Sequence, residues 1–182
     1  MKNKYCLLIV DMLNDFVTGS LGFDDAKKII KPNNELISFA HKNRIPVIYT
    51  CDSHLENIDF EFTKWDKHAI KGKKESEIIS ELKPSKEDYI LYKRRYSAFF
   101  HTDLDLLLKE LSVDTLIVTG LQTHICVLHT IASAFMLNFK TVLITDATTS
   151  LNKEDYDNSL KYIENIYGTK LLTTNEIYKY VK

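Results

Sequence analysis

Short, almost purely apolar runs recur along this chain, and longer amphipathic segments separate them. Most of the runs are apolar throughout rather than alternating with polar residues, which is typical of strands covered on both faces. We therefore expect an α/β fold in three layers: a doubly wound, mainly parallel sheet of about six strands with helices on both faces. The expected strands are 5–10, 45–51, 89–92, 116–119, 141–145 and a weaker one at 171–172.

Helical spacing marks several of the intervening segments. Two segments place apolar residues on one helical face, Leu104, Leu107, Leu108 and Leu111 in the first and Tyr156, Leu160, Ile163 and Tyr167 in the second. Segment 123–138 is apolar nearly all round, so we expect a buried helix there, with His129 packed inside it. Thr173 and Glu176 predict a capping box for a last helix.

Two segments are less regular. Pro32 interrupts the stretch 24–43, and because proline suits the first turn of a helix, we expect a helix to start there. Segment 53–72 is polar and lacks helical periodicity, which predicts a long loop, and such loops are uncommon unless they form part of a site. A short helix is expected after it, at 75–82.

Composition limits the class of protein. Of 182 residues, 45% are apolar and 27% charged, which predicts one globular domain covering 1–182. The formal net charge of -1 favours neither nucleic acid nor an anionic membrane as a partner. Three cysteines and an N-terminus unlike a secretion signal predict free thiols in a reducing compartment, the cytoplasm.

Chemically active residues fall at or just beyond the ends of the expected strands: Asp11, Asp52 with His54, Lys93 and Cys126. In doubly wound sheets this edge binds ligands. Cys126 follows a strand and a glycine near the start of a helix, where the helix dipole favours thiolate. A carboxylate could take the thiol proton and a cation could hold the sulfur charge, which predicts a cysteine-dependent amide hydrolase.

These assignments have alternatives in the sequence itself. Cys126 could be a small core residue, since buried cysteines usually are. Asp15 could serve in place of Asp11, which we prefer for its position at the strand end. The spacing does not distinguish Lys93 from Arg94 and Arg95.

The polar loop offers ligands for a metal ion. Asp52 and His54 lie two residues apart, on the same side of an extended segment, and Glu61 and His68 follow. Histidines with carboxylates suit zinc, iron or manganese, although the same residues could be ordinary loop polars. Aromatic side chains near these positions could hold a flat ligand, namely Phe16, Trp65 and Tyr96.

The chain resembles the isochorismatase-like cysteine hydrolases, and within them the nicotinamidases. The resemblance runs from Ile9-Val10-Asp11-Met12-Leu13-Asn14-Asp15-Phe16 through Tyr92-Lys93-Arg94-Arg95-Tyr96 to Gly120-x-x-Thr123-x-x-Cys126-Val127. It implies a catalytic triad of Asp11, Lys93 and Cys126. It also implies a cis peptide bond at Leu121–Gln122, with the N–H groups of Gln122 and Cys126 as an oxyanion hole.

The metal motif of nicotinamidases is also recognisable, as Asp52-Ser53-His54 and Trp65-Asp66-Lys67-His68. The resemblance implies a divalent metal held by Asp52, His54, His68 and, as in some members, Glu61. It places nicotinamide against this metal, with Phe16, Trp65 and Tyr96 lining the pocket.

The chain departs from the common nicotinamidase pattern at His124, where aspartate is usual, and at Asp66 and Lys67, where prolines occur. We predict a nicotinamidase that forms homo-oligomers, as the family often does. Two alternatives are a metal-free relative acting on another small amide or ester, and a catalytically silent binding protein with the same fold.

Overall fold

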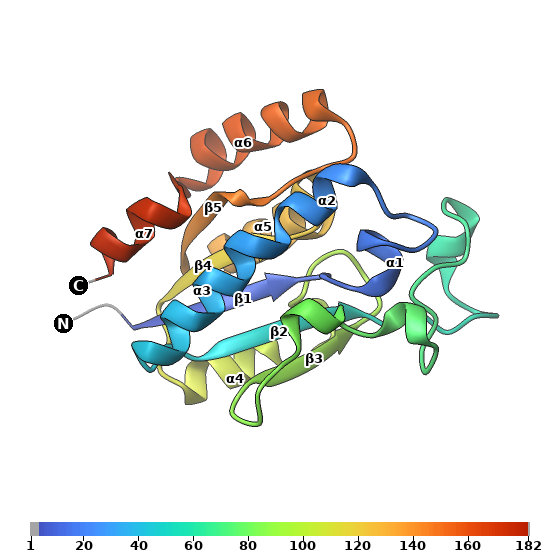
Figure 1. Cartoon of the computed structure of the whole chain (residues 1–182), viewed down its shortest axis with the longest axis horizontal. Coiled ribbons are helices and arrows are strands. Elements are labelled where there is room, and N and C mark those ends of the chain that lie inside the picture. Colours follow the sequence, from blue (N-terminus) through green and yellow to red (C-terminus); the bar gives the residue numbers. More distant parts are fainter. Residues whose placement is uncertain (1–3, 182) are drawn as a thin grey trace.

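A six-stranded sheet forms the centre of the computed structural model, which describes residues 4–181 (Figure 1). Its strands are β1 (Tyr5–Val10), β2 (Val47–Asp52), β3 (Tyr89–Lys93), β4 (Thr115–Gly120), β5 (Lys140–Thr148) and β6 (Lys170–Leu172). They lie in the order β3-β2-β1-β4-β5-β6, and all five pairings are parallel. The predicted α/β fold is thus confirmed, and the sheet is parallel throughout the described chain.

Helices cover both faces of the sheet. They are α1 (Asn14–Val17), α2 (Asp24–Lys28), α3 (Ile30–Lys42), α4 (Leu104–Glu110), α5 (Leu128–Met136), α6 (Lys153–Tyr167) and α7 (Thr174–Tyr180). Alternate side chains of β1 point to opposite faces. Leu7 and Ile9 join the core under α3 and α7, whereas Leu8 and Val10 join the core under α4, α5 and α6.

Two helix boundaries follow the sequence closely. Helix α3 begins at Ile30 and carries Pro32 in its first turn, where a missing N–H costs no hydrogen bond. The capping box of α7 is present, with the Thr173 N–H donating to Glu176 Oε2 at 2.7 Å. The capping box is thus confirmed, whereas the helix expected to start at Pro32 starts two residues earlier, at Ile30.

The short helix expected at 75–82 is wrong. Two 3-10 turns, Lys74–Ser76 and Ser80–Leu82, flank an extended stretch. The backbone of this stretch pairs with the segment after β1: the Asn14 N–H donates to Glu77 O at 3.0 Å, and the Ile79 N–H donates to Met12 O at 3.1 Å. These non-local hydrogen bonds replace those that a helix would make.

The continuous buried helix expected over 123–138 is also wrong in part. Thr123–Val127 forms a π-helical turn and α5 begins only at Leu128. Met136 is 72% exposed, and His129, expected inside, lies at the surface. Helix α5 belongs to an outer layer and packs one face against β5 and α6, so its apolar outer face stays uncovered within the described chain.

The strand order reverses direction between β1 and β4, and ligands bind at such a switch point in open α/β sheets. The two strands approach closely where they end. Gly120 has φ of 101°, and a Cβ there would lie 2.0 Å from Val10 O, so only glycine fits. Among residues 4–181, no helix has the length and apolar character needed to cross a bilayer.

Candidate active site and metal centre

Four neighbouring strands deliver the predicted chemical groups to one place. Asp11 directly follows β1, Asp52 ends β2, Lys93 ends β3, and Cys126 lies in the π-helical turn after β4. The first three are at most 2% exposed and Cys126 is 6% exposed. The convergence expected from the strand ends is therefore present, and it brings together a carboxylate pair, an ammonium and a thiol.

The Lys93 ammonium lies between these groups. Its Nζ is 2.7 Å from Asp11 Oδ2, 2.5 Å from Asp52 Oδ1 and 3.5 Å from Cys126 Sγ. Arg94 instead pairs with Asp59, and Arg95 donates to the Arg94 carbonyl. Of the three consecutive cations, only Lys93 contacts the thiol.

Asp15, the other candidate base, has a structural position. Its Oδ1 accepts from the Ser20 N–H at 3.1 Å and from the Ser20 hydroxyl at 2.8 Å. Its Oδ2 accepts from the Ala69 N–H at 2.7 Å. Asp15 thereby ties the loop after α1 to the long loop that follows β2, whereas Asp11 faces Lys93.

Burial sets the protonation of the thiol and its neighbours. Burial, and then the nearby Asp52 carboxylate, raise the pKa of Asp11 to about 7, against the lowering effect of Lys93. Burial also raises the pKa of Cys126 well above its usual value, and Asp11 and Asp52 add to this while Lys93 opposes it. The expectation that the helix dipole favours thiolate here is therefore wrong for the resting site, because desolvation and two carboxylates outweigh one ammonium. The resting group is a thiol beside a base.

The backbone before Cys126 has the predicted unusual form. The Leu121–Gln122 peptide bond is cis. The Gln122 carbonyl accepts from the Val127 N–H at 3.2 Å, and the Gln122 side-chain oxygen accepts from the Leu151 N–H at 3.2 Å. Gln122 lies in no helix or strand, and within residues 4–181 its N–H donates to no backbone carbonyl. It is available to a ligand beside Cys126.

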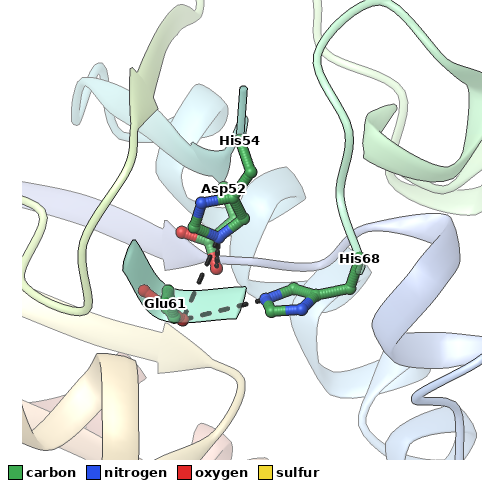
Figure 2. Close-up of side chains that lie close together, drawn as sticks. All are labelled: Asp52, His54, Glu61 and His68. Carbon is green, nitrogen blue, oxygen red and sulfur yellow. Dashed lines mark ion pairs between the residues drawn. The ribbon is translucent and has the colours of Figure 1, made fainter. Parts of the chain in front are cut away.

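A second cluster lies on the other side of Asp52. Figure 2 shows Asp52, His54, Glu61 and His68 converging from the end of β2 and from the following loop. His54 Nε2 is 3.7 Å from Asp52 Oδ2 and 3.9 Å from Glu61 Oε1, and His68 Nε2 is 3.8 Å from Glu61 Oε1. One ligand atom from each of the four lies within 4.8 Å of the others. All four predicted ligands thus come together.

Hydrogen bonds of the ring nitrogens fit these residues to a metal. His54 Nδ1 lies 2.9 Å from Asp59 Oδ2, and His68 Nδ1 lies 2.7 Å from the Asp66 carbonyl. Both acceptors favour a proton on Nδ1 and leave Nε2 with a lone pair directed at the cluster. His54 Nε2 is buried and has no hydrogen-bond partner. Buried polar atoms rarely stay unsatisfied, so the set of two imidazoles and two carboxylates suits a divalent ion.

Burial and neighbouring charges shift the pKa values of the two carboxyl groups in this cluster. Burial raises the pKa of Glu61, and Asp52 adds to this effect. Burial also opposes ionisation of Asp52, yet Lys93 and His54 together lower the pKa of this carboxyl below its usual value. Asp52 is therefore an anion that contacts both Lys93 and the metal cluster.

One cavity of about 350 Å³ opens onto both clusters. Its lining includes Asp11 and Cys126 of the catalytic group, and Asp52, Glu61 and His68 of the metal cluster. The three predicted aromatic residues, Phe16, Trp65 and Tyr96, all line it. Trp65 Nε1–H donates to the Tyr96 hydroxyl at 2.9 Å, which holds these two side chains together. His54 is fully buried behind the cavity wall.

The outer wall includes residues that sequence reasoning missed. Leu151, Asn152 and Asp155 line the cavity beside His124. His124 Nδ1 lies 2.9 Å from Ser150 Oγ, and its Nε2 lies 3.9 Å from Asp155 Oδ2. Leu151, Asn152 and Asp155 follow β5, and their position after a strand end was the signal that could have found them. Asp59 was missed too, and nothing in its spacing indicated it.

Comparison with known proteins assigns this chain to a family. Residues 5–176 match the model of the Isochorismatase domain, so the chain belongs to the isochorismatase family. Members of this family are hydrolases of amides and esters.

Three solved structures illustrate the similarity. N-carbamoylsarcosine amidase from Thermoplasma acidophilum is 35% identical with a TM-score of 0.89, covering 94% of this chain and 97% of that one. Nicotinamidase PncA from Bacillus subtilis is 31% identical with a TM-score of 0.88, covering 93% and 99%. Pyrazinamidase of Pyrococcus horikoshii, solved in complex with zinc, is 26% identical with a TM-score of 0.86, covering 93% and 99%.

Proposed function

We propose that this protein is a nicotinamidase, which hydrolyses nicotinamide to nicotinate and ammonia. The proposal is carried by one observation, the cluster of Asp52, Glu61 and His68 in the same cavity as Cys126. A thiol nucleophile suits many small amides, whereas a metal site beside it suits an amide whose ring carries a metal-binding nitrogen. The similarity to nicotinamidase PncA and to a zinc-bound pyrazinamidase supports this choice.

In the proposed reaction Asp11, Lys93 and Cys126 are the catalytic residues. Asp11 takes the proton of Cys126, and Lys93 stabilises the sulfur anion that forms. The sulfur attacks the carboxamide carbon, and the N–H groups of Gln122 and Cys126 stabilise the oxyanion. Asp11 then returns its proton to the departing ammonia as the C–N bond breaks.

The second half of the reaction releases the product. Water attacks the thioester carbon while Asp11, again ionised, accepts a proton from it. A C–O bond forms, the C–S bond breaks, and Cys126 regains its proton as nicotinate leaves. Because Asp11 accepts a proton in both halves, one carboxyl group serves the whole cycle.

Asp52, His54, Glu61 and His68 would hold the ion. Zinc is the first expectation, with iron and manganese as alternatives. When bound, the ion supplies a Lewis acid to which a pyridine nitrogen can coordinate. Phe16, Trp65 and Tyr96 would then enclose the flat ring.

Ammonia release from nicotinamide tests the proposal directly. Purified protein is assayed as isolated, after chelation, and after zinc add-back. We expect release by the zinc-loaded protein and a large loss after chelation. Absence of release with zinc, iron and manganese would contradict the nicotinamidase assignment.

Hydrolysis of another small amide is the second candidate. His124 and Asp155 give the outer wall of the cavity a polar pair, which suits a substrate with a second polar end. The similarity to N-carbamoylsarcosine amidase supports this alternative. Assay of ureido and aliphatic amides beside nicotinamide separates the two candidate functions. An enzyme for another small amide should hydrolyse ureido or aliphatic amides equally well before and after chelation, whereas a nicotinamidase should lose its activity on nicotinamide.

We also propose that residues 1–182 act as one domain, in the cytoplasm, as a homo-oligomer with a small molecule as its substrate. Three free, buried cysteines support a reducing compartment. Light scattering tests the assembly: we expect a mass of at least twice the 21.1 kDa of one chain, and a mass of 21.1 kDa would contradict the homo-oligomer.

A further inference from the structure

The loop between β2 and the 3-10 turns carries three of the four candidate ligands, so its conformation decides whether they meet. This loop has little regular secondary structure of its own to fix its conformation; its main regular element is a 3-10 turn over Phe60–Thr63. His54 is 0% exposed and its ring orientation must therefore be fixed by neighbours. One neighbour, Asp59, is an acidic residue with a side chain that is also fully buried.

Asp59 accepts hydrogen bonds from three directions. Its Oδ2 accepts from the His54 ring at 2.9 Å and from the Leu55 N–H at 3.0 Å. Its Oδ1 accepts from Arg94 Nε at 2.9 Å, and Arg94 Nη2 also pairs with it. Asp59 has no contact with the cavity, so it is placed to act on His54 rather than on a substrate.

Arg94 connects this carboxylate to the catalytic side of the site. It directly follows Lys93 in the chain, and the Lys93 carbonyl accepts from the Ser53 N–H at 2.9 Å. At the end of β3, Lys93 thus contacts Asp11 and Cys126, and Arg94, the next residue, contacts Asp59. The ion pair between Arg94 and Asp59 therefore ties the loop that carries His54 to the end of β3.

We propose that Asp59, held by Arg94, is the positioning residue of the metal centre: it keeps the proton of His54 on Nδ1 and so presents Nε2 to the ion. The proposal rests on the metal dependence proposed above. Carboxylates that accept from a ligating histidine typically improve metal affinity, and their loss weakens it. The buried and unpartnered His54 Nε2 is the atom on which this arrangement acts.

The test is the zinc affinity of Asp59→Asn, measured by competition with a chromogenic chelator in the absence of substrate. The carboxamide has one acceptor oxygen and cannot serve Arg94, His54 and Leu55 together. We expect zinc binding to weaken about 10- to 100-fold. Glu56→Gln is the matched control: Glu56 lies in the same loop but pairs with Lys67 and Lys73 at the surface, so its zinc affinity should equal that of the wild type.

A second readout separates positioning from folding. In ¹⁵N spectra of histidine-labelled, zinc-free protein, His54 should carry its proton on Nδ1 in the wild type and shift toward Nε2 in Asp59→Asn. Should Asp59→Asn not fold, Arg94→Gln serves instead, because it leaves the carboxylate in place and removes its anchor; it should weaken zinc binding in the same direction.

Native zinc affinity and an unchanged His54 tautomer in a folded Asp59→Asn would overturn the proposal, as would a wild-type protein that binds no zinc. Because zinc binding is measured without nicotinamide, its outcome is independent of turnover. Wild-type protein that binds zinc but releases no ammonia would contradict the proposed substrate and leave the role of Asp59 to be decided by the affinities.

Discussion

At the scale of single residues, Lys93 determines the character of the catalytic pocket. Asp11, Asp52 and Cys126 lie close enough together to hold a metal ion. The Lys93 Nζ, however, contacts all three, at 2.7, 2.5 and 3.5 Å. A buried ammonium therefore supplies the positive charge in this group. The second cluster contains no lysine or arginine, and a divalent ion can take that place there.

Replacing the nucleophile should separate chemistry from folding. Cys126→Ala should lower kcat/KM for the substrate by at least about 1,000-fold, since losing a nucleophile removes the covalent route. Its unfolding free energy should change by less than about 2 kcal/mol, because little side-chain volume is lost. The measurements are steady-state kinetics and urea unfolding. Cys6→Ala, a buried cysteine early in β1, should retain activity; activity of Cys126→Ala near that of Cys6→Ala would refute the mechanism.

The titration of Asp11 predicts the acidic limb of the pH profile. Burial and the neighbouring Asp52 raise the pKa of Asp11 to about 7. Since the base must be ionised to accept the thiol proton, kcat/KM should fall as the pH drops below about 7, approaching tenfold per unit. Above that pH it should level off. A profile that is flat between about pH 5 and 8 would rule out Asp11 as the base.

The sequence placed the candidate residues at strand ends but could not rank neighbours there. Lys93, Arg94 and Arg95 are consecutive cations at the end of one strand, and their position in the sequence does not rank them. The structure does: Lys93 contacts Cys126, whereas Arg94 pairs with Asp59. The protonation of Cys126 could not be derived either, because it depends on burial and on carboxylates from two other strands. Local dipole reasoning gave the opposite direction.

At the scale of elements, the close approach of β1 and β4 fixes the geometry of the site. The Leu121 N–H donates to Val10 O at 2.8 Å, and the next residues lead directly into the turn that carries Cys126. Asp11 follows Val10 on the neighbouring strand. The distance between base and nucleophile therefore depends on the packing of these two strand ends.

Gly120→Ala tests this approach. A Cβ at Gly120 would lie 2.0 Å from Val10 O and the residue has φ of 101°, so the strands must separate; we expect a loss of more than about 3 kcal/mol in unfolding free energy. Gly168→Ala is the control, since its φ is 62° and nothing lies within 4 Å of the added Cβ. It should cost about 1 kcal/mol. Equal losses in urea unfolding would show that strand contact is unimportant.

Elements with strong local patterns could be predicted, and those shaped by distant partners could not. The six strands and the capping box of α7 follow from apolar runs and from a four-residue motif. The extended backbone around Ile78 follows from pairing with Leu13, more than sixty residues away. The exposed face of α5 reflects which neighbours cover it, and the apolar composition of the helix carried no information on that point.

At the scale of the whole molecule, the metal cluster joins a strand end to a distant part of a loop. Asp52 ends β2, whereas His68 lies sixteen residues further on, next to Ala69, whose N–H donates to Asp15. The His54 N–H also donates to the Ala69 carbonyl at 2.9 Å. An ion bound here links segments that separate on unfolding. Metal affinity and global stability should therefore be coupled.

Zinc should consequently raise the melting temperature of the protein. At a free concentration about 100 times its Kd, an ion that binds only the native state adds about 2.7 kcal/mol. For a domain of this size that corresponds to about 5–11 °C, measured by scanning calorimetry of chelated and reloaded protein. His68→Ala should abolish the shift, because it removes a ligand. His124→Ala should preserve it, since His124 lines the same cavity but bonds to Ser150 instead of the cluster. Equal shifts in both variants would mean that zinc binds elsewhere, and the coupling of this site to the fold would have to be abandoned.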